Sequence, residues 1–289
     1  MKAENHMPWR ISLAALLAPV FVLLAHSPCS AYLQGLTARE KAMPEAGYFD
    51  PTYASLPEDV SAALSAGPIP SCKALKFEEI NELLEPGYLE VENGYCLNPD
   101  GTGFVAVKTD FPGATGDMVR WWFWWHAFKN VRYKIWCPGS HFAISVHDMD
   151  RMLDPTLSYE ERYLNNPQYP VEDTGTGYPW MSIRFVEPEA FGFDTSRFEA
   201  AGIDAVVCAV VGYRFAGITA IRHTCMVHLF RRTDAGLELR SRFWVGKALS
   251  PFLRRFTITL DTARSIAFHC ATEYNHLAGF LPEIYEEFK

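Results

Sequence analysis

The sequence lacks the features that mark several common classes of protein. It has no C-x-x-C pair, which disfavours a cysteine-based zinc site, and it has no internal repeat or low-complexity tract. It has no long basic run and a net charge of −8, so we expect no nucleic acid partner. What remains is an ordinary globular composition, with 49% hydrophobic and 21% charged residues among 289, enough for one or two domains.

The apolar run at residues 11–25 is shorter than the roughly 20 residues that a transmembrane helix needs. Lys2 and Arg10 precede this run, Pro19 interrupts it, and the small residue Ala31 ends the segment that follows. This pattern is typical of a secretory signal peptide. We therefore predict a signal peptide over residues 1–31, a secreted protein and no stable membrane span after processing. The alternatives are an uncleaved membrane anchor and a cytoplasmic chain that starts further downstream.

Six cysteines follow residue 31, and an oxidising compartment would allow some of them to pair. Cys72 and Cys96 flank a loop-rich segment and form our candidate disulfide. Cys208 and Cys225 lie in apolar runs, where we expect buried thiols.

The alternation of apolar and polar residues predicts the strands of an antiparallel sheet, separated by turn signals such as TDAG. YLEVENGYC and GFVAVKT, joined by NPDGTG, form a hairpin signal. Residues 32–82 are rich in Pro, Ala and Glu and carry short helical patterns, which predict a helical lead-in. The class is therefore α+β. Four later strands are predicted at WMSIRFV, AVVCAVVGYRF, CMVHLFRR and LELRSRFWV.

Aromatic residues dominate the segment before the middle of the chain. A helix is predicted over residues 116–130, and VRYKIW (131–136) then has a strand pattern. Prolines and glycines punctuate residues 150–180, which predicts a long functional or mobile loop. Tryptophans would cover all sides of the helix, so that some must lie in the core; they are Trp121, Trp122, Trp124 and Trp125.

A last helix is predicted from about Asp261, which can cap it, to Gly279. His269 and Glu273 are four residues apart in it and therefore share one face. Apolar residues cover most of this helix, and burying an unpaired charge costs several kcal/mol. A metal ion would be the partner that both side chains need, and zinc accepts His and carboxylate ligands. The alternative is that both residues face solvent.

Over roughly residues 80–280 the sequence resembles the 2,4-diacetylphloroglucinol hydrolases and phloretin hydrolases. The tryptophan run followed by RYxxW and PxxH is specific to this family, and so is RSRFWxG. The matching stretches are LLEPGYLEVENGYCLNPDGTGFVAV (83–107), MVRWWFWWHAFKNVRYKIWCPGSH (118–141), YPVEDTGTG (169–177), MVHLFRRTDAGLELRSRFWVG (226–246) and AFHCATE (267–273).

The resemblance implies a zinc-dependent hydrolase of the carbon–carbon bond between an acyl group and a polyphenol ring. It also implies a helix-grip (Bet v 1-like) fold, in which an antiparallel sheet wraps around a long C-terminal helix, here over residues 83–289. The family binds one zinc ion per chain through two His and two Glu. Carried over by position, these ligands are His141, Glu172, His269 and Glu273.

The resemblance further implies that Tyr133 contacts a substrate hydroxyl and that His228, on a strand facing the pocket, carries a proton. A core aromatic and a hydrogen-bonded core histidine are the alternatives. Trp244 is a further substrate-binding candidate, because aromatic walls suit a flat ring. Ile144 stands where a relative has a polar residue that binds a ring hydroxyl, so the ring pattern accepted here would differ.

We expect other polar residues near these motifs to support the site without binding the metal. His126 follows the tryptophan run, but His141 fits better as the ligand because Tyr133 and Glu172 then stand in family-like register. His276 is likewise expected to support the site. Arg240 and Arg242 alternate on one strand face and could hold a carboxylate or anchor the fold; they are the last candidates.

The sequence thus predicts a zinc-dependent hydrolase that acts on carbon–carbon bonds in ketonic substances. Its substrate would be an acylated polyphenol or a related aromatic polyketide, and the sequence permits a homodimer. Two alternatives stay open, namely a non-catalytic binder of an aromatic ligand and a zinc-dependent lyase or cyclase that acts on a polyketide.

Overall fold

The computed structural model describes residues 35–175, 180–215 and 218–289. The predicted signal peptide, residues 1–31, lies outside the described residues. Across these three ranges, no helix combines the length and the apolar character needed to cross a bilayer.

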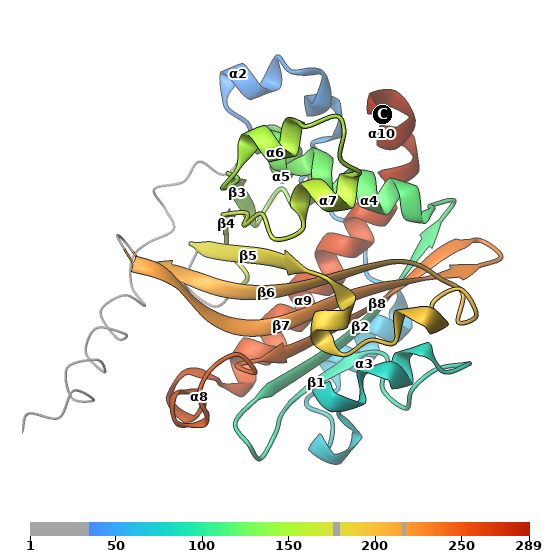
Figure 1. The fold of residues 1–289 in the computed structure, drawn as a ribbon, viewed down its shortest axis with the longest axis vertical. Coiled ribbons are helices and arrows are strands. Elements are labelled where there is room, and N and C mark those ends of the chain that lie inside the picture. The colour runs from blue at the N-terminus through green and yellow to red at the C-terminus, as the bar shows by residue number, and fades with distance from the viewer. Residues whose placement is uncertain (1–34, 176–179, 216–217) are drawn as a thin grey trace, which may run out of the picture.

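A six-stranded antiparallel sheet surrounded by helices gives the protein the predicted α+β architecture (Figure 1). The strand order is β1-β2-β8-β7-β6-β5. The predicted hairpin is confirmed as β1 and β2, with a shorter first strand, and the four later strands are confirmed as β5 to β8. Their bounds are β1 (Gly94–Leu97), β2 (Gly103–Pro112), β5 (Met181–Val186), β6 (Ile203–Phe215), β7 (Ile218–Thr233) and β8 (Gly236–Val245).

Successive side chains of a strand point to opposite faces of the sheet, which gives this sheet two different cores. On β8, Leu239 and Phe243 belong to the core that includes helix α9 (Leu260–Ala278); we call this side the pocket face. Trp244 belongs to a second, smaller core on the other side, which we call the opposite face.

Helix α9 is the predicted last helix, and it crosses the pocket face mainly over β1 and β2 (Figure 1). Its cap is Thr259, whose side chain accepts the N–H of Thr262, so the predicted cap at Asp261 is wrong. Thr259 has the extended backbone of a cap residue, whereas Asp261 already lies in the first turn, where its negative charge suits the helix dipole.

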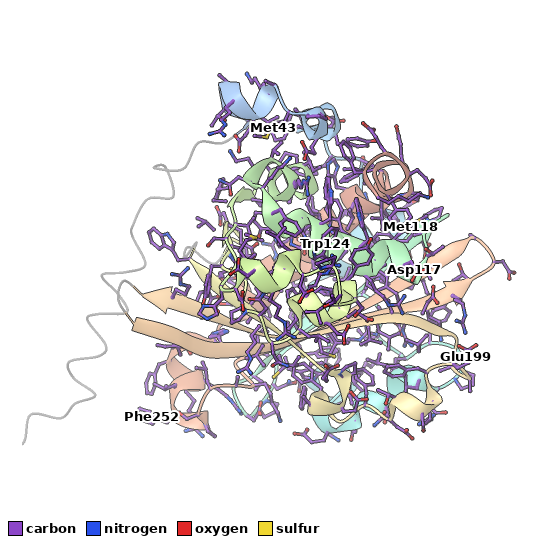
Figure 2. All side chains as sticks on the ribbon, turned by 45° about the horizontal axis from the view of Figure 1, so that its top comes forward. Met43, Asp117, Met118, Trp124, Glu199 and Phe252 are labelled. Carbon is purple, nitrogen blue, oxygen red and sulfur yellow. The ribbon has the colours of Figure 1, made fainter. Side chains whose placement is uncertain are left out.

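The aromatic helix is confirmed as α4 (Gly116–Trp125) and a following 3-10 turn, η5 (His126–Phe128). Three of its four tryptophans are buried, whereas Trp124 lies nearer the surface (Figure 2) and contacts the Arg162 guanidinium. The indoles thus fill the space between the sheet, α9 and α10 (Leu281–Phe288).

Residues 131–136 are not a strand but part of helix α5 (Asn130–Trp136), so that prediction is wrong. Nearly every residue of this short run is buried, and such a run has no period that separates a strand from a helix. In this helix the Lys134 ammonium lies 2.9 Å from the Glu40 carboxylate of the lead-in.

The lead-in contains helices, as predicted, and its boundary at residues 82 and 83 stays a prediction. Short elements, namely α6, α7 and β4, also occupy residues 150–180, the stretch predicted as irregular, and β4 pairs with β3, which precedes that stretch. The remaining bounds are α2 (Ala38–Lys41), η2 (Pro44–Tyr48), α3 (Glu58–Ser65), η3 (Ser71–Lys73), η4 (Phe77–Leu84), β3 (His141–Ala143), α6 (Met149–Leu153), α7 (Tyr159–Tyr163), β4 (Val171–Glu172), η6 (Pro188–Phe191), η7 (Thr195–Arg197) and α8 (Pro251–Thr257).

All cysteines of the described residues are free thiols, so the predicted disulfide is wrong. The Cys96 side chain is buried in the opposite-face core, whereas Cys72 is exposed, and the two therefore lie in different surroundings. Cys208 and Cys225 are buried as predicted, and burial raises the pKa of both thiols.

Candidate metal centre

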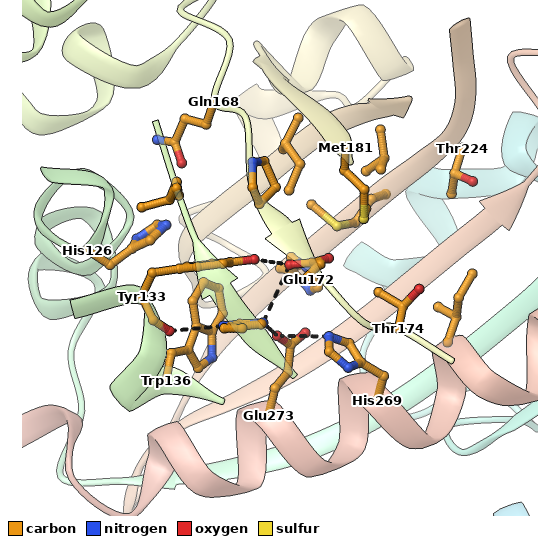
Figure 3. Close-up of a pocket in the computed structure, with 18 of the residues that line it drawn as sticks. His126, Tyr133, Trp136, Gln168, Glu172, Thr174, Met181, Thr224, His269 and Glu273 are labelled. Carbon is orange, nitrogen blue, oxygen red and sulfur yellow. Dashed lines mark hydrogen bonds and ion pairs between the residues drawn. The ribbon is translucent and has the colours of Figure 1, made fainter. Parts of the chain in front are cut away.

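Two short strands and one helix carry the four predicted ligands. His141 begins β3 and lies opposite Glu172 of β4 in an antiparallel pair. His269 and Glu273 are one turn apart on α9 and point toward that pair (Figure 3). The turn that leads into β3 is closed by the N–H of His141, which donates to the Cys137 carbonyl at 2.8 Å.

The structure brings all four residues together. The ligand atoms of His141, Glu172 and His269 lie within 4.8 Å of one another. The His141 Nε2 atom is 3.5 Å from Oε2 of Glu172 and 3.5 Å from Oε2 of Glu273. The His269 Nε2 atom is 3.6 Å from the same Glu273 oxygen (Figure 3).

These separations fit a coordination shell better than a hydrogen-bond network. An N–H···O hydrogen bond spans about 2.7–3.2 Å. The ligands of a tetrahedral ion at about 2.0–2.2 Å lie about 3.3–3.6 Å from one another, by simple geometry. The measured distances of 3.5 and 3.6 Å match the second value.

The tautomer of His141 also suits a metal ligand. Its Nδ1 atom lies 3.1 Å from the Tyr133 carbonyl oxygen, which can only accept, so Nδ1 carries the proton and Nε2 presents a lone pair. That Nε2 atom is buried without a hydrogen-bond partner among the described residues. A buried acceptor without a donor is costly, and a cation would remove the cost.

Burial shifts the pKa of every group in the cluster away from its charged form. It lowers the pKa of His141 to about 3 and lowers that of His269, so both imidazoles are neutral at pH 7, the form that binds metals. It raises the pKa of Glu273 to about 7, and it raises the pKa of Glu172 well above the usual range, to which the Glu273 charge adds. In the described part of the chain, neither carboxylate has a Lys or Arg ion-pair partner. A cation is the counter-charge that this arrangement calls for.

Tyr133 of α5 contacts two of the four residues. Its ring stacks on the His141 imidazole, with ring centroids 4.0 Å apart and planes within 4°. Its hydroxyl donates a short hydrogen bond to Oε2 of Glu172. Tyr133, which is predicted to contact a substrate hydroxyl, thus borders the cluster.

The cluster lies at the wall of a pocket lined mainly by apolar and aromatic side chains, among them Ile144, Met181 and Phe243. His228 is on a different wall, with Nδ1 2.8 Å from the Ser241 hydroxyl and its ring centroid 4.7 Å from that of Tyr274. Burial lowers the pKa of His228 to about 3. Such a pocket holds a flat ring between apolar walls and orients it through a few polar groups.

Residues 75–286 match the family described as the DAPG hydrolase PhiG domain. The chain belongs to this family. It is 34% identical to a 2,4-diacetylphloroglucinol hydrolase from a Pseudomonas species, an alignment that covers 85% of this chain and 88% of that protein. It is 29% identical to the phloretin hydrolase of Eubacterium ramulus, over 88% of this chain and 94% of that protein. The resemblance found in the sequence is therefore confirmed, and with it membership in a family of hydrolases.

A solved structure of norcoclaurine synthase from Thalictrum flavum, in complex with dopamine and hydroxybenzaldehyde, aligns with 71% of this chain and 99% of that chain. The TM-score is 0.33 and the sequence identity is 11%, a likeness too distant to bear on function.

Not every candidate from the family motifs reaches the pocket. Trp244 lies on the opposite face, where its indole N–H donates to the Leu75 carbonyl at 2.8 Å, so its assignment to substrate binding is wrong. Arg240 and Arg242 share that face and both bind the Glu92 carboxylate, at closest distances of 2.5 and 2.7 Å. The carboxylate that we predicted as a partner of the two arginines is therefore that of Glu92, and it has a structural role.

His126 and His276 support the site and do not join the cluster. The Nδ1 atom of His126 lies 2.7 Å from the Trp122 carbonyl oxygen, which holds the ring at the pocket wall. His276 makes a hydrogen bond to the Ile135 backbone and does not line the pocket. Gln168, a buried pocket residue that sequence reasoning missed, lies in a proline-bounded loop whose sequence carries no signal for it.

Proposed function

We propose that this protein is a zinc-dependent hydrolase that cleaves the carbon–carbon bond between an acyl group and a polyhydroxylated aromatic ring. The observation that carries the proposal is the convergence of two imidazoles and two carboxylates on one point inside an aromatic-walled pocket. The names of the relatives support it, because 2,4-diacetylphloroglucinol is itself an acylated polyphenol. The reaction adds water, releases a carboxylic acid and leaves a hydrogen on the ring carbon.

His141, Glu172, His269 and Glu273 would hold one zinc ion per chain. Zinc is favoured over magnesium or calcium because half of the donors are imidazole nitrogens. When bound, zinc supplies Lewis acidity that polarises an acyl carbonyl and lowers the pKa of a water molecule to about 7. Tyr133 orients the Glu172 carboxylate through its hydrogen bond and so fixes one side of the site.

The leaving group sets the harder requirement, because it is a ring carbon. A hydroxyl ortho to the acyl group lets the ring adopt a keto form, from which the carbon departs as an enolate and not as an aryl anion. The protein must therefore hold ring hydroxyls and deliver a proton to carbon. Tyr133 is placed to hold a hydroxyl beside the cluster, and His228, hydrogen-bonded to Ser241, is our candidate for the proton path.

Ile144 lines the pocket and offers no hydrogen bond from its side chain. The substrate would therefore present an apolar edge there. A small aromatic substrate of this kind fits the apolar walls, and we propose it as the ligand class. We also propose that the sheet and α9 form a helix-grip (Bet v 1-like) fold, supported by the way that α9 lies across the pocket face.

The reaction is tested with zinc-reconstituted protein and a panel of acylphloroglucinols in oxygen-18 water, with products read by mass spectrometry. We expect a labelled carboxylic acid and the free polyphenol. The matched control is the same substrate with its ortho hydroxyls as methyl ethers, which cannot form the ketone and should not turn over. Unlabelled acid, or equal turnover of the methylated ring, would favour a lyase, and binding without turnover would favour a binder.

The Tyr133→Phe variant tests whether this side chain acts on the substrate ring. The variant should still fill with zinc at saturating metal, although the lost bond to Glu172 weakens its affinity, and it should lose about ten-fold in kcat, the equivalent of one hydrogen bond of about 1.4 kcal/mol. Zinc content by elemental analysis and steady-state rates are the two measurements. An unchanged kcat in the zinc-saturated variant would show that Tyr133 acts on the metal site alone and not on the substrate.

A further inference from the structure

We infer that Tyr53, in the N-terminal lead-in, is a positioning residue for the metal centre, because it joins the turn before His141 to the helix that carries His269 and Glu273. The inference rests on the proposed zinc site. Nothing in the family motifs points to Tyr53, which lies upstream of the matched residues 75–286.

The Tyr53 hydroxyl binds the turn that sets His141. Its oxygen accepts the N–H of Gly139 at 2.6 Å and lies 3.4 Å from the Cys137 sulfur. The carbonyl of Cys137 in turn accepts the N–H of His141 at 2.8 Å. One hydroxyl therefore contacts two of the four residues that come directly before His141.

The ring and the residues next to it bind the other ligand-bearing element. The Tyr53 ring meets the His276 ring edge-on, with centroids 5.2 Å apart and planes at 74°. The Asn275 amide reaches the carbonyls of Ala54 and Ser55 at 3.4 and 3.5 Å. Asn275 and His276 belong to α9 and lie two and three residues after Glu273.

A brace of this kind is needed because the ligands themselves do not join β3 to α9. His141 and Glu273 come from these two elements, and their closest atoms are 3.5 Å apart. In the form that binds a metal, both atoms offer lone pairs, so no hydrogen bond joins them. A metal site tolerates displacements of only about 0.5 Å before its geometry suffers. The contacts of Tyr53 fix the distance between β3 and α9 from outside the pocket, so that the donors are spaced before an ion arrives.

The test measures zinc affinity by chelator competition on the full chain, for the wild type, Tyr53→Phe and Tyr48→Phe. Tyr48 is the matched control, because its hydroxyl binds Glu287 of α10 at 2.7 Å and not the His141 turn. We expect Tyr53→Phe to weaken zinc binding about ten-fold, the lower end of the range for outer partners of a metal site. Tyr48→Phe should leave it unchanged.

The visible absorption spectrum of the cobalt-substituted protein gives a readout that a general loss of stability would not move. Tyr53→Phe should shift and weaken the bands of four-coordinate cobalt, whereas Tyr48→Phe should reproduce the wild-type spectrum. Equal affinity and equal spectra for Tyr53→Phe and the wild type would overturn the inference. A wild type that binds neither ion would instead overturn the proposed zinc site itself.

Gly139→Ala provides a second variant, which carries the test if Tyr53→Phe fails to fold. A Cβ atom at Gly139 would lie 3.1 Å from the Tyr53 hydroxyl oxygen, closer than normal contact, and would push the hydroxyl away. Gly139→Ala should therefore weaken zinc binding in the wild type, and an unchanged affinity would contradict the brace. Where Tyr53→Phe folds, Gly139→Ala should have no further effect in that background. Additive losses in the double variant would show that the two residues act separately and would contradict the brace.

Discussion

Two buried carboxylate clusters lie on opposite faces of one sheet, and they differ in how their charge is balanced. On the opposite face, Glu92 is held by Arg240 and Arg242. Burial alone would raise the pKa of Glu92, but its hydrogen bonds and the arginine charges lower it to about 2. On the pocket face, Glu172 and Glu273 face neutral imidazoles, and burial raises the pKa of both.

The difference separates a structural cluster from the candidate functional one. Glu92 already has its counter-charges within the chain and needs nothing else. The pocket cluster is a buried set of donors that faces no Lys or Arg, so that its carboxyl groups either hold protons or bind an added cation. Buried polar groups without partners are costly, and their presence beside a pocket therefore indicates a ligand.

The largest effect is expected from removing a ligand of the pocket cluster. His269→Ala and Glu273→Ala should each reduce zinc affinity by more than the roughly 100-fold seen for outer partners of metal sites, and abolish turnover. Circular dichroism should show an unchanged fold. His126→Ala is the control and should keep its zinc. If His126→Ala loses the metal while His141→Ala retains it, the ligand assignment is wrong.

A large loss of stability is expected on the opposite face. Glu92→Gln leaves two buried guanidinium groups without their carboxylate, which costs about 3 kcal/mol or more. For a protein of this size, that equals a fall of roughly 6–12 °C in Tm. Zinc affinity should not change, since Glu92 lies on the other side of the sheet. A calorimetric scan measures the loss of stability, and a chelator competition measures zinc affinity. Weaker zinc binding in Glu92→Gln would show that the two faces are not independent.

The two clusters should also give opposite pH dependence. The pKa of Glu92 is lowered in the folded protein, so its contribution to stability is present above pH 4.5 and is lost as the pH falls toward 2. The pKa of Glu273 is raised to about 7, so in metal-free protein its contribution is full below pH 4.5 and is lost as the pH rises through 7. Urea titrations from pH 3 to 8 in chelator test this. Glu273→Gln should remove the loss between pH 4.5 and 7, and an unchanged slope would contradict the sign.

The smallest effect is expected from neighbouring residues of β8. Trp244→Phe removes one hydrogen bond on the opposite face and should cost about 1 kcal/mol without changing kcat or KM. Phe243→Leu, one residue away on the pocket face, should raise KM. A change in KM for Trp244→Phe, or none for Phe243→Leu, would show that the two faces are not functionally distinct.

Long alternating runs allowed the sheet to be predicted from sequence, because β6 and β8 each show many repeats of the two-residue period. The same period could have corrected the assignment of Trp244. It stands two and four residues after Arg242 and Arg240, and must share their face. The helix at residues 130–136 could not be predicted, because its burial on nearly all sides hides the period.

The convergence of the four candidate ligands was predicted in part by spacing and in part by resemblance. The pair His269 and Glu273 follows from helical periodicity alone. His141 and Glu172 come from strands of three and two residues, which are too short to leave a pattern, and only their pairing places them together. No sequence pattern indicated Glu92 as the partner of the two arginines, because this contact links residues far apart in the sequence.

Crystallography of the zinc-reconstituted wild type, with anomalous data collected at the zinc edge, shows directly whether the four side chains hold one ion. We expect one peak per chain within about 2.0–2.2 Å of a nitrogen or oxygen atom of His141, Glu172, His269 and Glu273. A crystal without a peak, or with a peak that any of these four side chains does not reach, would contradict this expectation.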